Sequence, residues 1–160
     1  MTIKIGDHLP TVKLKHLGAD GIKDVTTDEL FAGKKAVLFA VPGAFTPTCS
    51  AKHVPSFVNH IDQLTAKGVD VIACVSVNDV FVMAAWGKDQ KADGKVLMLA
   101  DGNGEFTKAL GLETDLSNFG LGVRSQRYAL VVDHGKVTVL NVEKPGAYEV
   151  SSAEAILQAL

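Results

Sequence analysis

Short apolar runs along the chain predict β-strands. The first, Lys-Ala-Val-Leu-Phe-Ala-Val at residues 35–41, is almost continuously apolar, which is typical of a strand covered on both faces. Two later runs flank Asp-His-Gly-Lys at residues 133–136, a sequence that favours a tight turn, so they predict a hairpin. The predicted strands are residues 35–41, 69–77, 96–100, 128–132 and 137–142.

Apolar residues at intervals of three and four predict a helix between the first two strands. Val54, Phe57, Ile61 and Leu64 share one face of residues 47–67, and a glycine follows. Pro55 lies inside this segment and is expected to kink it, because proline has no N–H to donate.

Capping residues place three further helices. Asp79 is the expected N-cap of one, and a second, short helix ends near Gly111. Ser151 or Ser152 caps the last, and Ser-Ser-Ala-Glu at residues 151–154 fits a capping box. Residues 112–126 contain two glycines and no regular pattern, and we expect a loop of the active-site type there.

The order of elements predicts an α/β fold with a mixed central sheet and helices on both faces. Strands and helices alternate first, which favours parallel pairing, and an antiparallel hairpin follows. No linker or internal repeat interrupts the 160 residues, so we expect a single domain over residues 1–160.

Composition narrows the class of protein. The formal net charge of -2 and the scattered basic residues do not indicate a nucleic-acid-binding surface. No apolar run is long enough to span a membrane. The N-terminal residues lack the features of a signal or transit peptide, and two cysteines cannot form a secreted disulfide framework. We therefore expect a cytoplasmic protein with reduced thiols.

Cys49 lies where a helix start favours a thiolate. Thr46 suits the N-cap, Pro47 the first helical position and Cys49 the third. First-turn N–H groups have no intrahelical acceptor, and they favour an anion nearby. The Thr46 hydroxyl is within reach of the sulfur, and Pro42 removes a competing donor. A cysteine in such a place is also often only a small apolar side chain.

His53, one turn after Cys49, allows two other hypotheses. The pair could be the nucleophile and base of a cysteine hydrolase, although no orienting residue or hydrolase motif accompanies it. Cys49, His53 and His60 could also be metal ligands, although the usual zinc spacing is missing.

The segment Pro42-x-x-x-Thr46-x-x-Cys49 resembles the active-site signature of the peroxiredoxins. Val-Pro-Gly-Ala-Phe-Thr-Pro-Thr-Cys is similar to the type II (atypical, peroxiredoxin-V-like) subgroup in particular. The resemblance continues through residues 52–55, 75–79, 86–87, 99–101 and 124–128, so it covers nearly the whole chain in order.

This resemblance implies a thioredoxin-like fold and a peroxidase without metal or organic cofactor. Cys49 would attack the O–O bond of a hydroperoxide and become a sulfenic acid. Pro42 and Thr46 would be the family's active-site proline and threonine, in the loop and at the helix start before the cysteine. Arg127 matches the family's active-site arginine and would bind both thiolate and peroxide, with Arg124 a weaker candidate for support. Read without the resemblance, Arg127 could simply pair with a surface carboxylate.

The resemblance leaves the source of reducing equivalents open. Members of the subgroup carry a second cysteine either at the spacing of Cys74 or near the C-terminal helix, where this chain has serines. Since Cys74 falls inside a predicted strand, we expect a one-Cys cycle with glutathione or glutaredoxin as reductant. The alternatives are a thioredoxin-dependent peroxidase with Cys74 as resolving cysteine, and a redox-sensing binding module. The family also suggests a homodimer.

Overall fold

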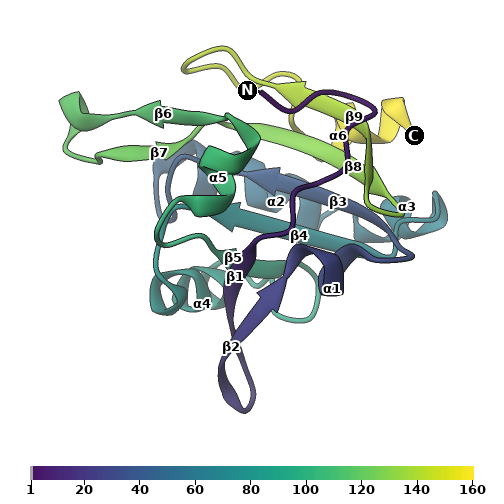
Figure 1. The fold of residues 1–160 in the computed structure, drawn as a ribbon, viewed down its shortest axis with the longest axis horizontal. Coiled ribbons are helices and arrows are strands. Elements are labelled where there is room, and N and C mark those ends of the chain that lie inside the picture. The colour runs from purple at the N-terminus through teal and green to yellow at the C-terminus, as the bar shows by residue number, and fades with distance from the viewer. Residues whose placement is uncertain (1) are drawn as a thin grey trace.

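A seven-stranded sheet forms the centre of the structure, a computed structural model that describes residues 2–160 (Figure 1). The strand order is β2-β1-β5-β4-β3-β8-β9. The strands are β1 Lys13–Gly18, β2 Gly21–Thr26, β3 Lys35–Ala40, β4 Val71–Ser76, β5 Leu97–Ala100, β8 Tyr128–Asp133 and β9 Lys136–Val142.

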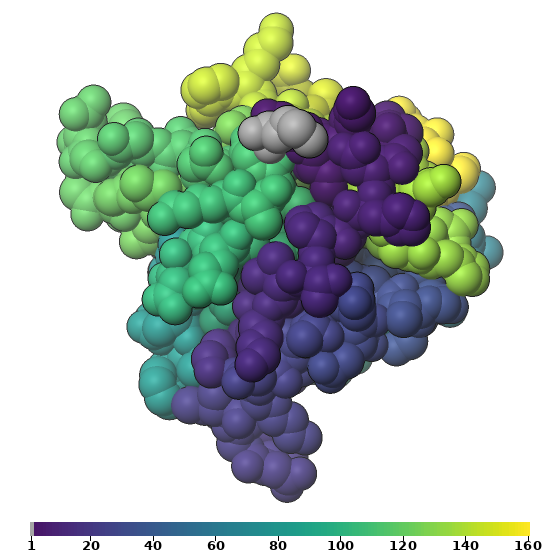
Figure 2. Space-filling view, viewed as in Figure 1, coloured from purple at the N-terminus to yellow at the C-terminus, as the bar shows by residue number. Residues whose placement is uncertain are grey.

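The sheet is mixed, which confirms the predicted α/β class. Strands β3, β4 and β5 run parallel at its centre, and β8 and β9 form the predicted antiparallel hairpin beside β3. A second antiparallel pair, β1 and β2, lies at the other edge and was not predicted. This hairpin projects from the body of the molecule (Figures 1 and 2).

Helices cover both faces of the sheet. Because side chains alternate along a strand, Val37 and Phe39 of β3 pack into one core and Leu38 into the other. One face carries α2 Val54–Val58, α3 Ile61–Ala66, α4 Val80–Asp89 and α6 Ala153–Ala159, and the other α1 Thr27–Phe31 and α5 Glu105–Leu110. The N-terminal segment lies over the second face (Figure 2). None of the helices within residues 2–160 has the length and apolar character needed to span a bilayer.

The predicted helix over residues 47–67 is broken into three pieces. A π-helical turn, η1 Cys49–His53, precedes α2, and a turn at residues 59–60 separates α2 from α3. The N–H of Val54 donates to the carbonyl of Cys49, five residues back. The next residue, Pro55, has no N–H to donate, so regular α-helical hydrogen bonds resume only after it. The expected kink is therefore a wide turn that starts at Cys49.

The predicted caps are confirmed in part. Asp79 accepts the N–H of Val82 at 2.8 Å, and Ser152 caps α6. The capping box over residues 151–154 is wrong, because the N–H and hydroxyl of Ser151 both donate to the carboxylate of Glu143. That bond takes the amide that Glu154 would have accepted.

Residues 112–126 form a second small sheet where an irregular loop was expected. Strands β6 Glu113–Asp115 and β7 Val123–Ser125 pair antiparallel around the 3₁₀ turn η2 Ser117–Phe119. Each strand has three residues and is largely polar, so its sequence carries no apolar alternation that predicts pairing. The hairpin extends away from the main sheet (Figure 1).

The contact between α4 and β5 generates a prediction about stability. A Cβ on Gly87 would lie 2.9 Å from Met98 Cγ, closer than packed side chains allow. A helical Gly→Ala change normally gains about 1 kcal/mol, but overpacking costs about 1–3 kcal/mol. We expect Gly87→Ala to lower the free energy of unfolding in urea, and the same change in a Met98→Ala background to raise it. Stabilisation in the unaltered background would contradict this packing.

Candidate active site

The register of the sheet brings two distant segments together. Strand β8 is antiparallel to β3, and its first residue, Tyr128, pairs with Ala40, the last residue of β3. Arg127 therefore lies beside the segment that leaves β3 and leads to Cys49. Side chains 78 positions apart in sequence meet at this edge.

Cys49 has two polar contacts at its sulfur. Thr46 Oγ1 lies 2.8 Å from Cys49 Sγ, and Arg127 Nη2 lies 3.1 Å from it. Cys49 itself is fully buried. The structure thus brings together Cys49, Thr46 and Arg127, as the sequence predicts. Both contacts donate hydrogen bonds, which favours negative charge on the sulfur.

Thr46 acts differently from an ordinary N-cap. Its carbonyl accepts the N–H of Ser50 at 3.0 Å, as at a helix start, but its hydroxyl lies 2.7 Å from the Gly43 carbonyl as well as beside the sulfur. One hydroxyl carries one proton, so it donates to only one of these acceptors at a time. The hydroxyl can therefore turn from Gly43 to the sulfur when the sulfur is ionised.

His53 is neutral and its tautomer follows from its neighbours. Its ring is fully buried, with Nε2 2.9 Å from the Ser151 carbonyl and Nδ1 2.9 Å from Arg127 Nη1. A carbonyl only accepts, so Nε2 carries the hydrogen and Nδ1 accepts from Arg127. Burial, and then the Arg127 charge, lower the His53 pKa to about 3. Since the Nδ1 lone pair accepts from Arg127 and not from the Cys49 thiol, His53 is not placed as the base of a cysteine hydrolase.

Arg127 divides its guanidinium between two acceptors. Nη2 contacts Cys49 and Nη1 contacts His53, while the Tyr148 ring centroid lies 6.0 Å from Cζ. Within residues 2–160 the guanidinium forms no ion pair with a carboxylate, so the surface-pair interpretation is wrong. The planar fork of arginine suits two acceptors in one plane, which a lysine could not reach together.

Pro42 and Arg124 meet at the loop before Cys49. Arg124 Nη1 donates to the Pro42 carbonyl at 3.4 Å, and its Nε donates to the Leu121 carbonyl at 2.9 Å. A Cβ on Gly43 would lie 3.1 Å from Arg124 Nη1 and 3.2 Å from Thr46 Cγ2, so both side chains pack closely over this glycine. Arg124 thus contacts the loop backbone, and none of its hydrogen bonds to the described residues reaches Cys49.

The end of β4 supplies support that sequence reasoning missed. Asn78 Oδ1 accepts the N–H of Ala44 at 3.0 Å and the hydroxyl of Ser76 at 2.5 Å. These bonds tie the loop that carries Thr46 to the central strand. Glu143 and Tyr148, near the C-terminus, were missed as well. Only Asn78 falls within a segment of the family resemblance, which is the one signal that pointed to it.

Cys74 lies in the interior of β4, opposite Phe39 on one side and Met98 on the other. It is fully buried, and both cysteines are free. Burial, with a smaller contribution from Cys49, raises the pKa of the Cys74 thiol well above its ordinary value, against a small opposing effect of Arg127. Cys74 is therefore a neutral thiol.

The histidines do not form a metal site with Cys49. His60 Nδ1 lies 2.6 Å from the Ser56 carbonyl, and both ring nitrogens of His53 are already bonded. Among residues 2–160 no cluster of three or more His, Cys, Asp or Glu is arranged to hold a metal ion.

Comparison with known proteins identifies the family. The redoxin family matches residues 4–157. Peroxiredoxin-2E-2, chloroplastic, of Oryza sativa subsp. japonica is 60% identical over 99% of this chain and 73% of its own. Peroxiredoxin-2C of the same organism is 56% identical over 99% of this chain and 98% of its own.

A solved structure supports the same family assignment. Reduced Prx3 in complex with H2O2 from Vibrio vulnificus is 59% identical, covers 99% of both chains and has a TM-score of 0.96. Fold, sequence and the surroundings of Cys49 lead to one conclusion. This chain belongs to the peroxiredoxins of the type II subgroup, thiol peroxidases with a thioredoxin-like fold within the redoxin family.

Proposed function

We propose that Cys49 is the residue that reduces the hydroperoxide. The observation that carries this proposal is the convergence of Thr46 Oγ1 and Arg127 Nη2 on Cys49 Sγ. The thiolate sulfur attacks one peroxide oxygen and the O–O bond breaks. The sulfur keeps that oxygen as a sulfenic acid, and the leaving oxygen takes a proton and departs as water or an alcohol.

Thr46 and Arg127 stabilise the charge that moves during this step. As negative charge leaves the sulfur for the two oxygens, donors that already surround the sulfur can bond those oxygens without reorganising. Pro42 exposes no N–H toward the site, and Arg124 steadies its carbonyl. Arg127 and Thr46 would thus bind the substrate as well, with Arg124 acting on the loop.

The reductant we propose is an external thiol, glutathione or glutaredoxin. Its sulfur attacks the sulfenic sulfur of Cys49, water leaves, and a second thiol reduces the mixed disulfide. The burial of Cys74 in a central strand and the raised pKa of its thiol support this one-Cys cycle, because a neutral buried thiol is a poor nucleophile. Serines at positions 151 and 152 offer no second thiol at the start of α6.

A cytoplasmic homodimer is the assembly we propose. Three phenylalanines are exposed: Phe45 in the loop before Cys49, Phe81 in the first turn of α4 and Phe119 in the 3₁₀ turn of the β6–β7 hairpin. Phe45 has a φ of 63°, a conformation that bulky residues rarely adopt and that is usually retained for function. Large exposed aromatic side chains of this kind are favoured at protein interfaces. Two free thiols agree with a reducing compartment.

The role of Arg127 is tested by rapid-mixing measurement of Cys49 oxidation by hydrogen peroxide. Cys49→Ser should abolish turnover. Arg127→Lys keeps the positive charge but loses the two terminal guanidinium nitrogens. We expect the rate constant for Cys49 oxidation to fall about 10²–10³-fold. The matched Arg124→Lys variant alters a guanidinium whose hydrogen bonds to the described residues all go to backbone carbonyls, so the loss of rate should be much smaller. Equal losses in both lysine variants, or turnover by Cys49→Ser, would refute these roles.

The one-Cys cycle is tested with Cys74→Ala and with each reductant supplied in turn. We expect Cys74→Ala to keep peroxide turnover driven by glutathione and glutaredoxin, because Cys74 forms no part of the cycle. Mass spectrometry after one equivalent of peroxide should show a sulfenic acid or a mixed disulfide at Cys49. A dominant Cys49–Cys74 disulfide, with turnover by thioredoxin that Cys74→Ala loses, would establish the alternative cycle.

The dimer is tested by sedimentation of Phe81→Glu. Phe81 is 63% exposed, so the change should leave the fold intact while placing a charge in the proposed interface. We expect the mass in solution to fall from two chains to one. A matched Ile22→Glu variant, at an equally apolar exposed position on the β1–β2 hairpin, should keep the dimer. A monomeric unaltered protein would contradict the proposal.

A further inference from the structure

Glu143, 16 positions after Arg127, lies outside every motif that the sequence singles out. It follows β9 directly and is 6% exposed. Its Oε2 accepts four hydrogen bonds: from the N–H groups of Glu149 at 2.8 Å, Val150 at 2.9 Å and Ser151 at 2.9 Å, and from the Ser151 hydroxyl at 2.7 Å. One carboxylate oxygen thus holds the loop between β9 and α6 in a single conformation.

Glu143 is ionised in this environment. Burial by itself raises the pKa of Glu143, but the bonds from the Ser151 hydroxyl and the three amides outweigh burial and leave the pKa below its ordinary value. A carboxylate that accepts several N–H bonds is stabilised in its charged form. Charge-assisted bonds of this kind are also stronger than neutral ones, so the loop is firmly held.

The fixed loop in turn orients His53. With the N–H and hydroxyl of Ser151 bonded to Glu143, the Ser151 carbonyl points at His53 Nε2 at 2.9 Å. That contact requires the hydrogen on Nε2 and leaves the lone pair of Nδ1 for Arg127 Nη1. The Tyr148 ring, from the same loop, packs against His53 with centroids 5.3 Å apart.

The same glutamate also holds the backbone of Arg127. The N–H of Glu143 donates to the Arg127 carbonyl at 2.9 Å. A ring of hydrogen bonds therefore closes from the Arg127 carbonyl through Glu143, Ser151 and His53 back to the Arg127 guanidinium. The guanidinium nitrogen Nη2 lies outside this ring and donates to Cys49 Sγ at 3.1 Å.

We propose that Glu143 is a positioning residue for peroxide reduction, acting through Ser151 and His53 to aim Arg127 Nη2 at the Cys49 sulfur. This inference rests on the proposed role of Arg127. Displacement of a catalytic group by about 1 Å can cost a hundredfold in rate, so a ring that fixes both ends of Arg127 has a direct effect on the reaction. Glu143 itself touches neither the sulfur nor the substrate.

The test compares two reactions of Cys49 in the folded, full-length protein. Oxidation by hydrogen peroxide depends on Arg127, whereas alkylation by iodoacetamide requires only the thiolate. Both rates are measured across pH and compared on the plateau where the thiol is fully ionised. We expect Glu143→Ala to lower the ratio of peroxide rate to alkylation rate by about tenfold to a hundredfold. Glu143→Gln, which keeps one acceptor, should lower the ratio less.

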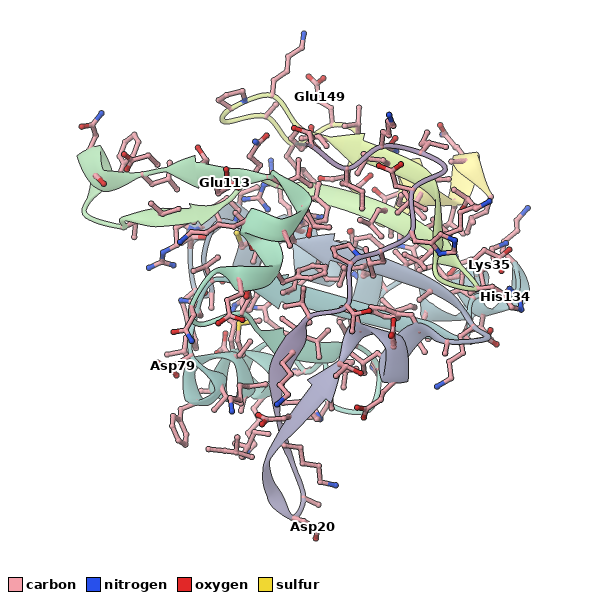
Figure 3. The ribbon with its side chains drawn as sticks, in the orientation of Figure 1. Asp20, Lys35, Asp79, Glu113, His134 and Glu149 are labelled. Atoms are coloured by element: carbon pink, nitrogen blue, oxygen red, sulfur yellow. The ribbon has the colours of Figure 1, made fainter. Side chains whose placement is uncertain are left out.

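Glu149→Gln is the matched control, because it removes one negative charge from the same loop. Glu149 is exposed, and Figure 3 shows it on the loop at the edge of the molecule. We expect its ratio to equal that of the unaltered protein. An unfolded fraction would also be alkylated at Cys49 and would lower the ratio. Because Cys74 is fully buried in the fold, its alkylation reports that fraction, and the ratio is taken where Cys74 stays unmodified. If Glu143→Ala does not fold, a ratio in Glu143→Gln below that of the unaltered protein supports the proposal, and an unaltered ratio overturns it.

Three results would overturn the inference, and they differ in whether the proposed role of Arg127 survives. In the first, the ratio is unaltered in Glu143→Ala and Glu143→Gln while Arg127→Lys loses the peroxide reaction. This result would refute the role of Glu143 and leave the role of Arg127 intact. A full peroxide rate in Arg127→Lys removes the proposed role of Arg127, and the positioning role falls with it. An equal loss in Glu149→Gln would show that loop charge, and not the bonds of Glu143, sets the rate.

Discussion

The Arg127 guanidinium is shared between a sulfur and a histidine nitrogen, and the chemistry at Cys49 depends on that division. The cation lies beside the thiol and is held there by a neutral acceptor, so none of its charge is cancelled by a carboxylate among residues 2–160. A carboxylate partner would draw the guanidinium away and weaken its effect on the sulfur. The depressed pKa of His53, about 3, keeps that partner neutral over the whole physiological range.

The fold makes this arrangement from ordinary pairing rules. The antiparallel register of β3 and β8 sets Arg127 beside the end of β3, and the π-helical turn at Cys49–His53 lies on the same side. Hydrogen bonds from the end of β4 hold the loop between them through Asn78. The reacting groups thus come from segments that a rigid central sheet fixes, while the β9–α6 loop supplies the outer support through Glu143.

Sequence patterns predicted the parts of the fold that bury apolar side chains. Strand β3 and its neighbours are nearly all apolar, so their existence and their places along the chain followed from the pattern of apolar runs. The β1–β2 and β6–β7 hairpins were not predicted because few residues of their strands are buried and most are polar, so the sequence shows no clear period of two. At the site, Cys49 and Thr46 were found from the residues of the helix start, and Arg127 through a resemblance. Glu143 was not, because its importance comes from bonds to backbone groups that no residue pattern records.

The nitrogen-15 NMR spectrum of the His53 ring tests the central claim most directly. We expect one protonated nitrogen, Nε2, and an Nδ1 without hydrogen whose chemical shift stays constant from neutral pH down to about pH 4, because the His53 pKa is about 3. Arg127→Lys should change the Nδ1 shift, since it removes the donor. A ring that titrates near the ordinary value of 6.5, or that carries its proton on Nδ1 at neutral pH, would contradict the account, because Arg127 would then have no acceptor there.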